Sequence, residues 1–265
     1  MTGSADFRLH SPELGTEYSV FLDPETGKRG ALLLVLDGDD QFDAARTAAR
    51  GLRASGRLPP VHLVGIGYGG GYRSPVNRRA RDYTPTRAAS EPAETGGADA
   101  FLEFIRARLL PALAERMEFA REDIGVGGHS LGSLLGAYAL VRREPLFARY
   151  LISAPALWWD DQSIFGMIRS EPAGEEVPLG DARPAAPPAH GMGAADSAAA
   201  PLPRAFLCIG AEDTPSMNAE LDQFEGLLRA GRLGPVTFTS RRFAGRNHFD
   251  VLTDAYSEGL AWLYA

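Results

Sequence analysis

Cysteine and long hydrophobic runs are almost absent from this sequence of 265 residues. Its one cysteine, Cys208, cannot form an internal disulfide, and one thiol cannot build a zinc site alone, which excludes a disulfide scaffold. No apolar run reaches the roughly 20 residues of a membrane span, and the opening stretch MTGSADFRLH has no apolar signal core. We therefore expect a cytoplasmic protein without a membrane partner.

Lysine is equally scarce, since Lys28 is the only one and arginine carries almost all of the positive charge. Asp and Glu outnumber Lys and Arg by 34 to 27, and the resulting net charge of −7 argues against a surface that binds nucleic acid. The hydrophobic fraction of 45% and the charged fraction of 23% are ordinary for a globular protein. They exclude wholesale disorder and a collagen-like chain.

Small residues and prolines are concentrated in one segment, 171–203, which contains no aromatic residue. Such a composition cannot bury enough apolar surface to order itself. Strongly patterned segments lie on both sides of it, and neither flank looks self-sufficient. The sequence therefore predicts a single domain over residues 1–265 that carries a flexible insertion at about 171–203.

Strand-like and helix-like segments alternate along the rest of the chain, and several strand candidates are continuous aliphatic runs, as in strands covered on both faces. The strand candidates are Phe7–His10, Tyr18–Leu22, Ala31–Leu36, Val61–Gly67, Ile124–Gly127, Tyr150–Ser153, Arg204–Ile209 and Val236–Arg241; the helix candidates are Phe101–Met117, Leu131–Val141, Met217–Ala230 and Val251–Tyr264. This alternation predicts an α/β fold with a mostly parallel sheet, antiparallel N-terminal strands and helices on both faces.

The strongest chemical signal is a short motif between a predicted strand and a predicted helix. Gly128-x-Ser130-x-Gly132 fits the G-x-S-x-G nucleophile elbow, where a serine on a tight, strained turn needs small neighbours two residues away. The turn would lift Ser130 Oγ above the sheet edge and place the Leu131 amide at a helix start, where it can stabilise an oxyanion. A Gly-rich turn whose serine has no catalytic role is the alternative.

A nucleophilic serine needs a general base, and His248 is the best placed of the five histidines. It lies between the last predicted strand and the last predicted helix, where this architecture supplies its base in the chain order Ser, acid, His. His129 adjoins the serine, but adjacency on an elbow points its ring the wrong way. A helix-capping histidine is the alternative for His248.

The acid of the triad is expected directly after the predicted strand Arg204–Ile209. Asp213 stands three residues after Gly210, which lets the loop turn before the carboxylate points back, and Glu212 is the second candidate. The acid would fix the imidazole tautomer and stabilise the imidazolium. One or both acids could instead cap the helix near Pro215, and a Ser–His dyad without an acid is a further alternative.

A second oxyanion donor is expected in the loop Asp37–Phe42, which follows the predicted strand Ala31–Leu36. Gly38 allows a sharp turn, and the Asp39 amide would then lie beside the Leu131 amide. An ordinary acidic surface turn is the alternative.

No cofactor or metal is predicted. The acidic loop lacks both a fitting ligand spacing and a nearby histidine. Gly65–Gly70 matches G-x-G-x-x-G, yet the residues that follow read as a loop. A dinucleotide site needs a helix at that point, because helix amides bind the pyrophosphate.

Substrate contacts are expected from a basic loop and a tryptophan pair. Arg78, Arg79 and Arg81 lie beside the predicted rim of the site, and guanidinium forks suit oxygen anions. Trp158 and Trp159 follow a predicted strand and are expected to line the pocket wall. A solvated loop with local ion pairs is the alternative for the arginines, and ordinary core packing is the alternative for the tryptophans.

Several stretches together resemble the Putative esterase family of α/β-hydrolases, which includes esterase D, feruloyl esterases and siderophore esterases, and the siderophore-esterase branch resembles this chain most. The matching stretches are Leu36–Asp39, Val64–Tyr68, Arg81–Thr86, Gly96–Leu102, Gly128–Gly132, Ser153–Trp159 and Asn247–His248. They cover the chain from the first strands to the last histidine apart from 171–203. The resemblance implies an α/β-hydrolase fold, Ser130 as nucleophile and His248 as base, whereas the acid is missing or replaced in some members.

The sequence thus predicts a serine carboxylic-ester hydrolase that acts through an acyl-enzyme on a small-molecule ester, siderophore-like or other. An acyltransferase on the same scaffold and a non-catalytic binding protein are the alternatives.

Overall fold

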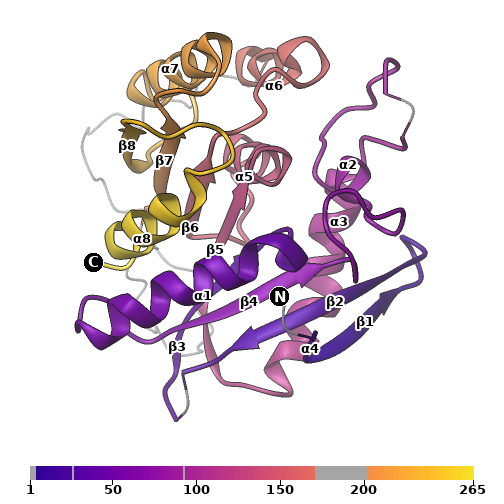
Figure 1. Cartoon of the computed structure of the whole chain (residues 1–265). Coiled ribbons are helices and arrows are strands. Elements are labelled where there is room, and N and C mark those ends of the chain that lie inside the picture. Colours follow the sequence, from indigo (N-terminus) through magenta and orange to yellow (C-terminus); the bar gives the residue numbers. More distant parts are fainter. Residues whose placement is uncertain (1–3, 26, 92, 171–201) are drawn as a thin grey trace, which may run out of the picture.

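The computed structural model describes residues 4–25, 27–91, 93–170 and 202–265, which form one eight-stranded sheet in the order β1-β2-β4-β3-β5-β6-β7-β8 (Figure 1). The strands are β1 (Phe7–Ser11), β2 (Thr16–Asp23), β3 (Gly30–Val35), β4 (Val61–Gly67), β5 (Phe119–His129), β6 (Arg149–Ser153), β7 (Arg204–Gly210) and β8 (Thr237–Phe243). The pairs β1/β2 and β2/β4 are antiparallel, and the remaining pairs are parallel. This arrangement confirms the predicted α/β fold.

Helices cover both faces of the sheet. On one face, α1 (Gly38–Ala54) and α8 (Leu252–Leu263) pack against each other and against apolar side chains such as Leu33 and Phe206. The other helices are α2 (Arg79–Asp82), α3 (Ala98–Phe104), the π-helical turn η1 (Ile105–Leu109), α4 (Leu110–Ala114), α5 (Leu131–Val141), α6 (Trp159–Ser170) and α7 (Pro215–Arg229). Helices α3 to α7 contribute the apolar cluster on the opposite face, and α5 is buried along its whole length after Leu131.

The structure corrects two helix predictions. A helix begins at Gly38, within the loop expected over Asp37–Phe42. Its buried face is made largely of Ala45, Ala48 and Ala49, so an amphipathic pattern based on large side chains misses it. The helix expected over Phe101–Met117 runs without interruption from Ala98 to Ala114, with a π-helical turn between α3 and α4, and therefore starts and ends three residues earlier than expected.

The parallel strands place the carboxyl ends of β3, β5, β6, β7 and β8 at one edge of the sheet. Every residue predicted to carry chemistry follows one of these ends or the neighbouring end of β4. The predicted insertion at 171–203 lies outside the described residues except for Leu202 and Pro203. No helix in the described part of the chain is both long enough and apolar enough to span a bilayer.

Candidate active site

Ser130 lies on the turn between β5 and α5 in a backbone conformation (φ 58°, ψ −119°) that non-glycine residues rarely adopt. The turn is tight, because a Cβ atom on Gly128 would come within 2.6 Å of the backbone of Gly132. The Ser130 amide donates to the carbonyl of Ser153 (3.0 Å), and its carbonyl accepts from the Leu134 amide (3.0 Å). These contacts hold the serine in the strained geometry that a nucleophile elbow requires.

His248 and Asp213 form a hydrogen bond of 2.8 Å between Nδ1 and Oδ2. Asp213 follows β7 and has a side chain only 2% exposed, whereas His248 follows β8 and is 23% exposed. The second oxygen of Asp213 accepts from the Thr214 amide (2.8 Å), which fixes the plane of the carboxylate. Glu212 is exposed and forms no hydrogen bond or ion pair with a histidine among the described residues. The structure therefore brings Asp213 to His248.

The imidazole of His248 lies beside the elbow, since its ring centroid is 4.5 Å from that of His129. Its Nδ1 is occupied by Asp213, which leaves Nε2 for a proton from the serine. No hydrogen bond joins Ser130 Oγ to His248 within the described chain, and such contacts are often long before a substrate binds.

His129 is buried behind the serine rather than aimed at a substrate. Its Nδ1 lies 3.1 Å from Ser153 Oγ, and its ring packs against the ring of His248. Burial, and then the proximity of His248 and Arg79, lower the pKa of His129 to about 3. The neutral ring thus packs between the end of β6 and the loop that carries His248. Sequence reasoning missed this contact, and Ser153, the polar residue that ends the run Tyr150–Ser153, is the one feature that could have indicated it.

Two helix starts meet at the elbow. Strands β3 and β5 are neighbours, so α1 and α5 begin side by side, and a Cβ atom on Gly132 would lie 3.3 Å from Asp37 Oδ2. The amides of Leu131, Gly38 and Asp39 have no acceptor among the described residues, as expected for the first turn of a helix. The Asp39 carboxylate accepts from the Tyr68 amide (2.5 Å), which fixes the start of α1. The predicted donors Leu131 and Asp39 therefore lie at adjacent helix starts, and the Gly38 amide beside them is a further candidate donor that the sequence did not single out.

Arg79 forms a buried ion pair with Asp37 directly beside the elbow. Both hydrogen bonds, from Nε and Nη2 to the two carboxylate oxygens, are 2.9 Å long. Burial raises the pKa of Asp37, and the Arg79 guanidinium acts against that rise. Most of the fork of Arg79 is thus occupied by the protein.

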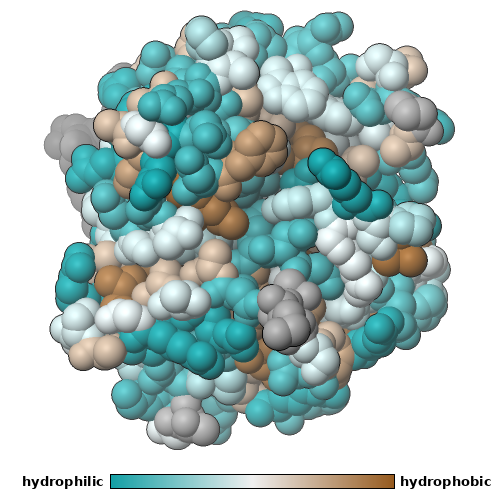
Figure 2. All heavy atoms as spheres, in the orientation of Figure 1, coloured by the Kyte–Doolittle hydropathy of each residue, from teal (hydrophilic) through white to brown (hydrophobic). Residues whose placement is uncertain are grey.

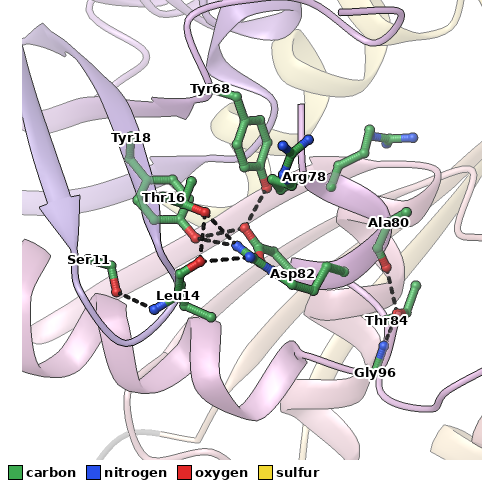
Figure 3. A network of polar contacts seen from close by, with 12 residues as sticks. Ser11, Leu14, Thr16, Tyr18, Tyr68, Arg78, Ala80, Asp82, Thr84 and Gly96 are labelled. Carbon is green, nitrogen blue, oxygen red and sulfur yellow. Dashed lines mark hydrogen bonds and ion pairs between the residues drawn. The ribbon is translucent and has the colours of Figure 1, made fainter. Parts of the chain in front are cut away.

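Arg81 belongs to a different buried network, which lies between α2 and the β1–β2 hairpin (Figure 3). It donates to Asp82 (2.6 Å), to the Leu14 carbonyl (2.8 Å) and to Thr16 (2.9 Å), while Asp82 also accepts from Tyr18 (2.7 Å). The Arg81 side chain is only 10% exposed, so this arrangement does not favour Arg81 as a substrate ligand.

Of the three predicted arginines, Arg78 alone has an exposed side chain. Among the described residues its donors reach the nearby carbonyls of Pro75 and Asn77. A substrate can displace such local contacts at little cost, so Arg78 is the best placed of the three for an anionic group.

The two tryptophans differ in their exposure to solvent. Trp158 is 44% exposed, two residues after Ala156, whose amide donates to the Ser130 carbonyl (3.2 Å). Trp159 is buried, and its Nε1 donates to the Thr86 carbonyl (3.4 Å). Trp158 can therefore line the site, whereas the surroundings of Trp159 are those of a core residue.

Exposed hydrophobic side chains gather at the same edge of the sheet. Tyr72 and Val76 follow β4, Trp158 follows β6 and Phe249 follows β8, with Phe249 90% exposed. Figure 2 shows hydrophobic surface beside a hollow between the β8–α8 region and the loop that carries α2. A cavity of about 710 Å³ lies elsewhere, beside the amino ends of β6 and β7, and contains no predicted site residue.

The described residues contain no group of three or more His, Cys, Asp or Glu side chains suited to a metal ion. The polar groups at the carboxyl edge are instead a serine on an elbow, a histidine–carboxylate pair and free helix amides. This set of groups, on this sheet order, defines the α/β-hydrolase class.

Comparison with known proteins agrees with that class. The family described as "Putative esterase" matches residues 11–206, and the chain belongs to this family. A "Siderophore triacetylfusarinine C esterase" of Aspergillus fumigatus is 38% identical over 149 residues, which are 54% of this chain and 50% of that protein. A "Siderophore enterobactin esterase" of Emericella nidulans is 31% identical over 159 residues, 54% of this chain and 52% of that protein. The chain spans about half the length of the curated relatives it matches.

Solved structures resemble the chain over almost its whole length. The "BES protein from Bacillus cereus" has a TM-score of 0.75 at 21% identity, and the aligned region covers 100% of this chain and 96% of that protein's chain. The "Siderophore hydrolase EstA from Aspergillus nidulans" has a TM-score of 0.73 at 21% identity, with coverages of 97% and 93%. At these identities the likeness concerns the fold, and it confirms the predicted α/β-hydrolase fold.

Proposed function

We propose that this protein is a serine esterase that cleaves carboxylic esters through an acyl-enzyme. The observation that carries this proposal is the conjunction of Ser130 in a strained elbow with the His248–Asp213 hydrogen bond at the same sheet edge. The esterases among its relatives support the same class of reaction.

In the proposed reaction, Ser130 Oγ attacks the ester carbonyl carbon while His248 Nε2 takes the hydroxyl proton. Asp213 holds Nδ1–H and stabilises the imidazolium. The amides of Leu131 and Asp39 donate to the oxyanion, which forms only in the tetrahedral intermediate. Collapse breaks the ester bond, and His248 protonates the leaving alcohol. Water then gives a proton to His248 and attacks the carbonyl carbon of the acyl-enzyme. Collapse breaks the acyl–Oγ bond and releases the acid, and His248 returns the proton to Ser130 Oγ.

We propose a small ester with an anionic or siderophore-like acyl or alcohol part as the substrate. Two relatives are named as siderophore esterases, and Arg78 has an exposed side chain in the loop that follows β4. The exposed ring of Trp158 would form one wall of the site. A substrate panel of short acyl esters, feruloyl esters and ferric siderophore esters would rank these possibilities.

The Ser130→Ala variant tests the proposal. We expect hydrolysis of p-nitrophenyl butyrate to fall by on the order of 10³-fold or more, because the nucleophile is lost. The melting temperature should stay close to that of the wild type, since Ser130 Oγ takes part in no hydrogen bond among the described residues. A fluorophosphonate probe should label the wild type and not the variant.

Ser216→Ala, on the exposed start of α7, is the matched control and should keep full activity. Retained esterase activity or probe labelling in Ser130→Ala would refute the assignment of the nucleophile. Product analysis with added alcohols would show whether water or an alcohol accepts the acyl group.

A further inference from the structure

Arg79 contacts two separate turns with a single guanidinium. Its Nε and Nη2 bind the two oxygens of Asp37, and Nη2 also lies 3.4 Å from the carbonyl oxygen of His129. Its guanidinium carbon stands 4.7 Å from the ring centroid of Tyr72 and 5.9 Å from that of Tyr83. The Arg79 side chain is only 17% exposed, so these contacts fix it in one orientation.

Both partners of Arg79 lie one or two residues before the amides that meet at the elbow. Asp37 is the residue before α1 and therefore sets the direction of the Gly38 and Asp39 amides. His129 ends β5, two residues before Leu131. One side chain from α2 thus joins the β3–α1 turn to the β5–α5 turn.

Asp37 needs such a partner for conformational and for electrostatic reasons. It adopts a left-handed conformation (φ 52°, ψ 46°), which costs a non-glycine residue roughly 1 kcal/mol. Its carboxylate is completely buried close to the place where an oxyanion would form. Without a counter-ion that charge would repel the oxyanion, and the fork of arginine is the side chain that can neutralise both oxygens at once.

We propose that Arg79 is a positioning residue that holds the two halves of the oxyanion hole in register by bridging Asp37 and the His129 carbonyl. This inference rests on the proposed esterase function and adds a role for Arg79 that differs from binding a substrate anion. A group that aligns the oxyanion donors affects the transition state of every ester, whether or not the ester carries a charge.

The Arg79→Lys variant tests this role, because lysine keeps the charge but cannot form the two parallel bonds. We expect kcat for the uncharged ester p-nitrophenyl acetate to fall about 10- to 100-fold while KM changes less than about threefold. The inhibition constant of a boronic acid, which forms a tetrahedral adduct with the serine, should rise in parallel with the loss of kcat/KM.

Arg149→Lys is the matched control. Arg149 binds both oxygens of Asp123 and stacks on Tyr264 with its side chain 19% exposed, but it lies at the amino end of β6. Its replacement should lower the melting temperature and leave kcat and boronate inhibition unchanged. If Arg79→Lys does not fold, the Arg79→Gln/Asp37→Asn double variant, which leaves no unpaired buried charge, should show the same loss of kcat and of boronate affinity.

Two results would overturn the inference. The first is an Arg79→Lys enzyme with unchanged kcat and boronate inhibition for the uncharged ester. The second is a rise in KM confined to anionic esters, which would make Arg79 a substrate ligand. Activity in Ser130→Ala would instead refute the esterase function itself, so the two failures are distinguishable.

Discussion

At the scale of single residues, backbone strain is concentrated where we place the chemistry. Asp37, Ser130 and Ala154 are non-glycine residues with positive φ, and they follow the neighbouring strands β3, β5 and β6. Asp160–Gln162, at the start of α6, extend this group. Such conformations persist only where surrounding contacts hold them, and they tend to occur at functional sites.

The choice between the two candidate acids gives one residue-scale prediction. Asp213→Asn should lower kcat by on the order of 10²- to 10⁴-fold, because an amide cannot stabilise the imidazolium and can favour the wrong tautomer. Glu212→Gln removes a neighbouring exposed carboxylate and is the matched control, with little expected effect. Steady-state kinetics on p-nitrophenyl butyrate would compare the two variants, and a larger loss in Glu212→Gln would exchange their roles.

His129 gives a prediction about stability and pH. Its pKa falls from 6.5 to about 3 on folding, chiefly through burial, so between these values the unfolded chain binds more protons than the native one. The free energy of unfolding should therefore decrease as the pH drops below 6.5, with a contribution from His129 of up to about 1.4 kcal/mol per pH unit.

His129→Gln should remove this contribution, because glutamine does not titrate. Urea unfolding between about pH 7.5 and about pH 5 should then give a flatter dependence on pH in the variant than in the wild type. His10→Gln, at an exposed position of β1, controls for the removal of a histidine as such. If the unfolding free energy depends on pH equally in His129→Gln and in the wild type, protonation of His129 does not destabilise the folded state.

At the scale of elements, the pairing of His248 with Asp213 depends on the path of the loop after β8, which crosses the end of β7. The last residue of β7, Gly210, lies directly under the backbone of Arg246 and Asn247, and a Cβ atom there would overlap the Arg246 carbonyl. This close approach brings the loop after β8 next to the loop after β7.

Gly210→Ala should therefore displace the loop that carries His248. We expect kcat/KM to fall by about 10-fold or more, together with a loss of stability, because the alanine methyl meets backbone that cannot move freely. Gly226→Ala in α7 is the matched control, since that site is open and the change should stabilise the helix by up to about 1 kcal/mol. Kinetics and thermal melts would measure both, and unchanged kcat/KM in Gly210→Ala would mean that the loop adjusts without disturbing the pair.

At the scale of the whole molecule, one sheet connects every described part of the chain. Strands β6 and β7, which flank the segment 171–203, pair in parallel, and the cores on the two faces both run along the sheet. We propose on this basis that residues 1–265 form a single domain.

A single domain should unfold in one cooperative transition. Differential scanning calorimetry should give a calorimetric enthalpy equal to the van't Hoff enthalpy, and circular dichroism and tryptophan fluorescence should report the same midpoint. Two separable transitions would instead point to two domains.

The sequence by itself determined the α/β architecture and the elbow. Both are local in origin: aliphatic runs alternate with helical periods, and the Gly128-x-Ser130-x-Gly132 spacing provides the small neighbours that a strained serine requires. The start of α1 and the π-helical turn between α3 and α4 escaped that reasoning, because an alanine-rich face and one wider helical turn leave little pattern in the hydrophobic residues.

Only the tertiary structure decided which side chains the site can use. Asp213 rather than Glu212 meets His248, across 35 residues of sequence, because the loop after β8 crosses the end of β7. Arg79 and Arg81 are bound by buried carboxylates, while Arg78 stays exposed. Such choices depend on contacts between residues far apart in the chain, and no local pattern of residue types encodes which neighbour a charge will find.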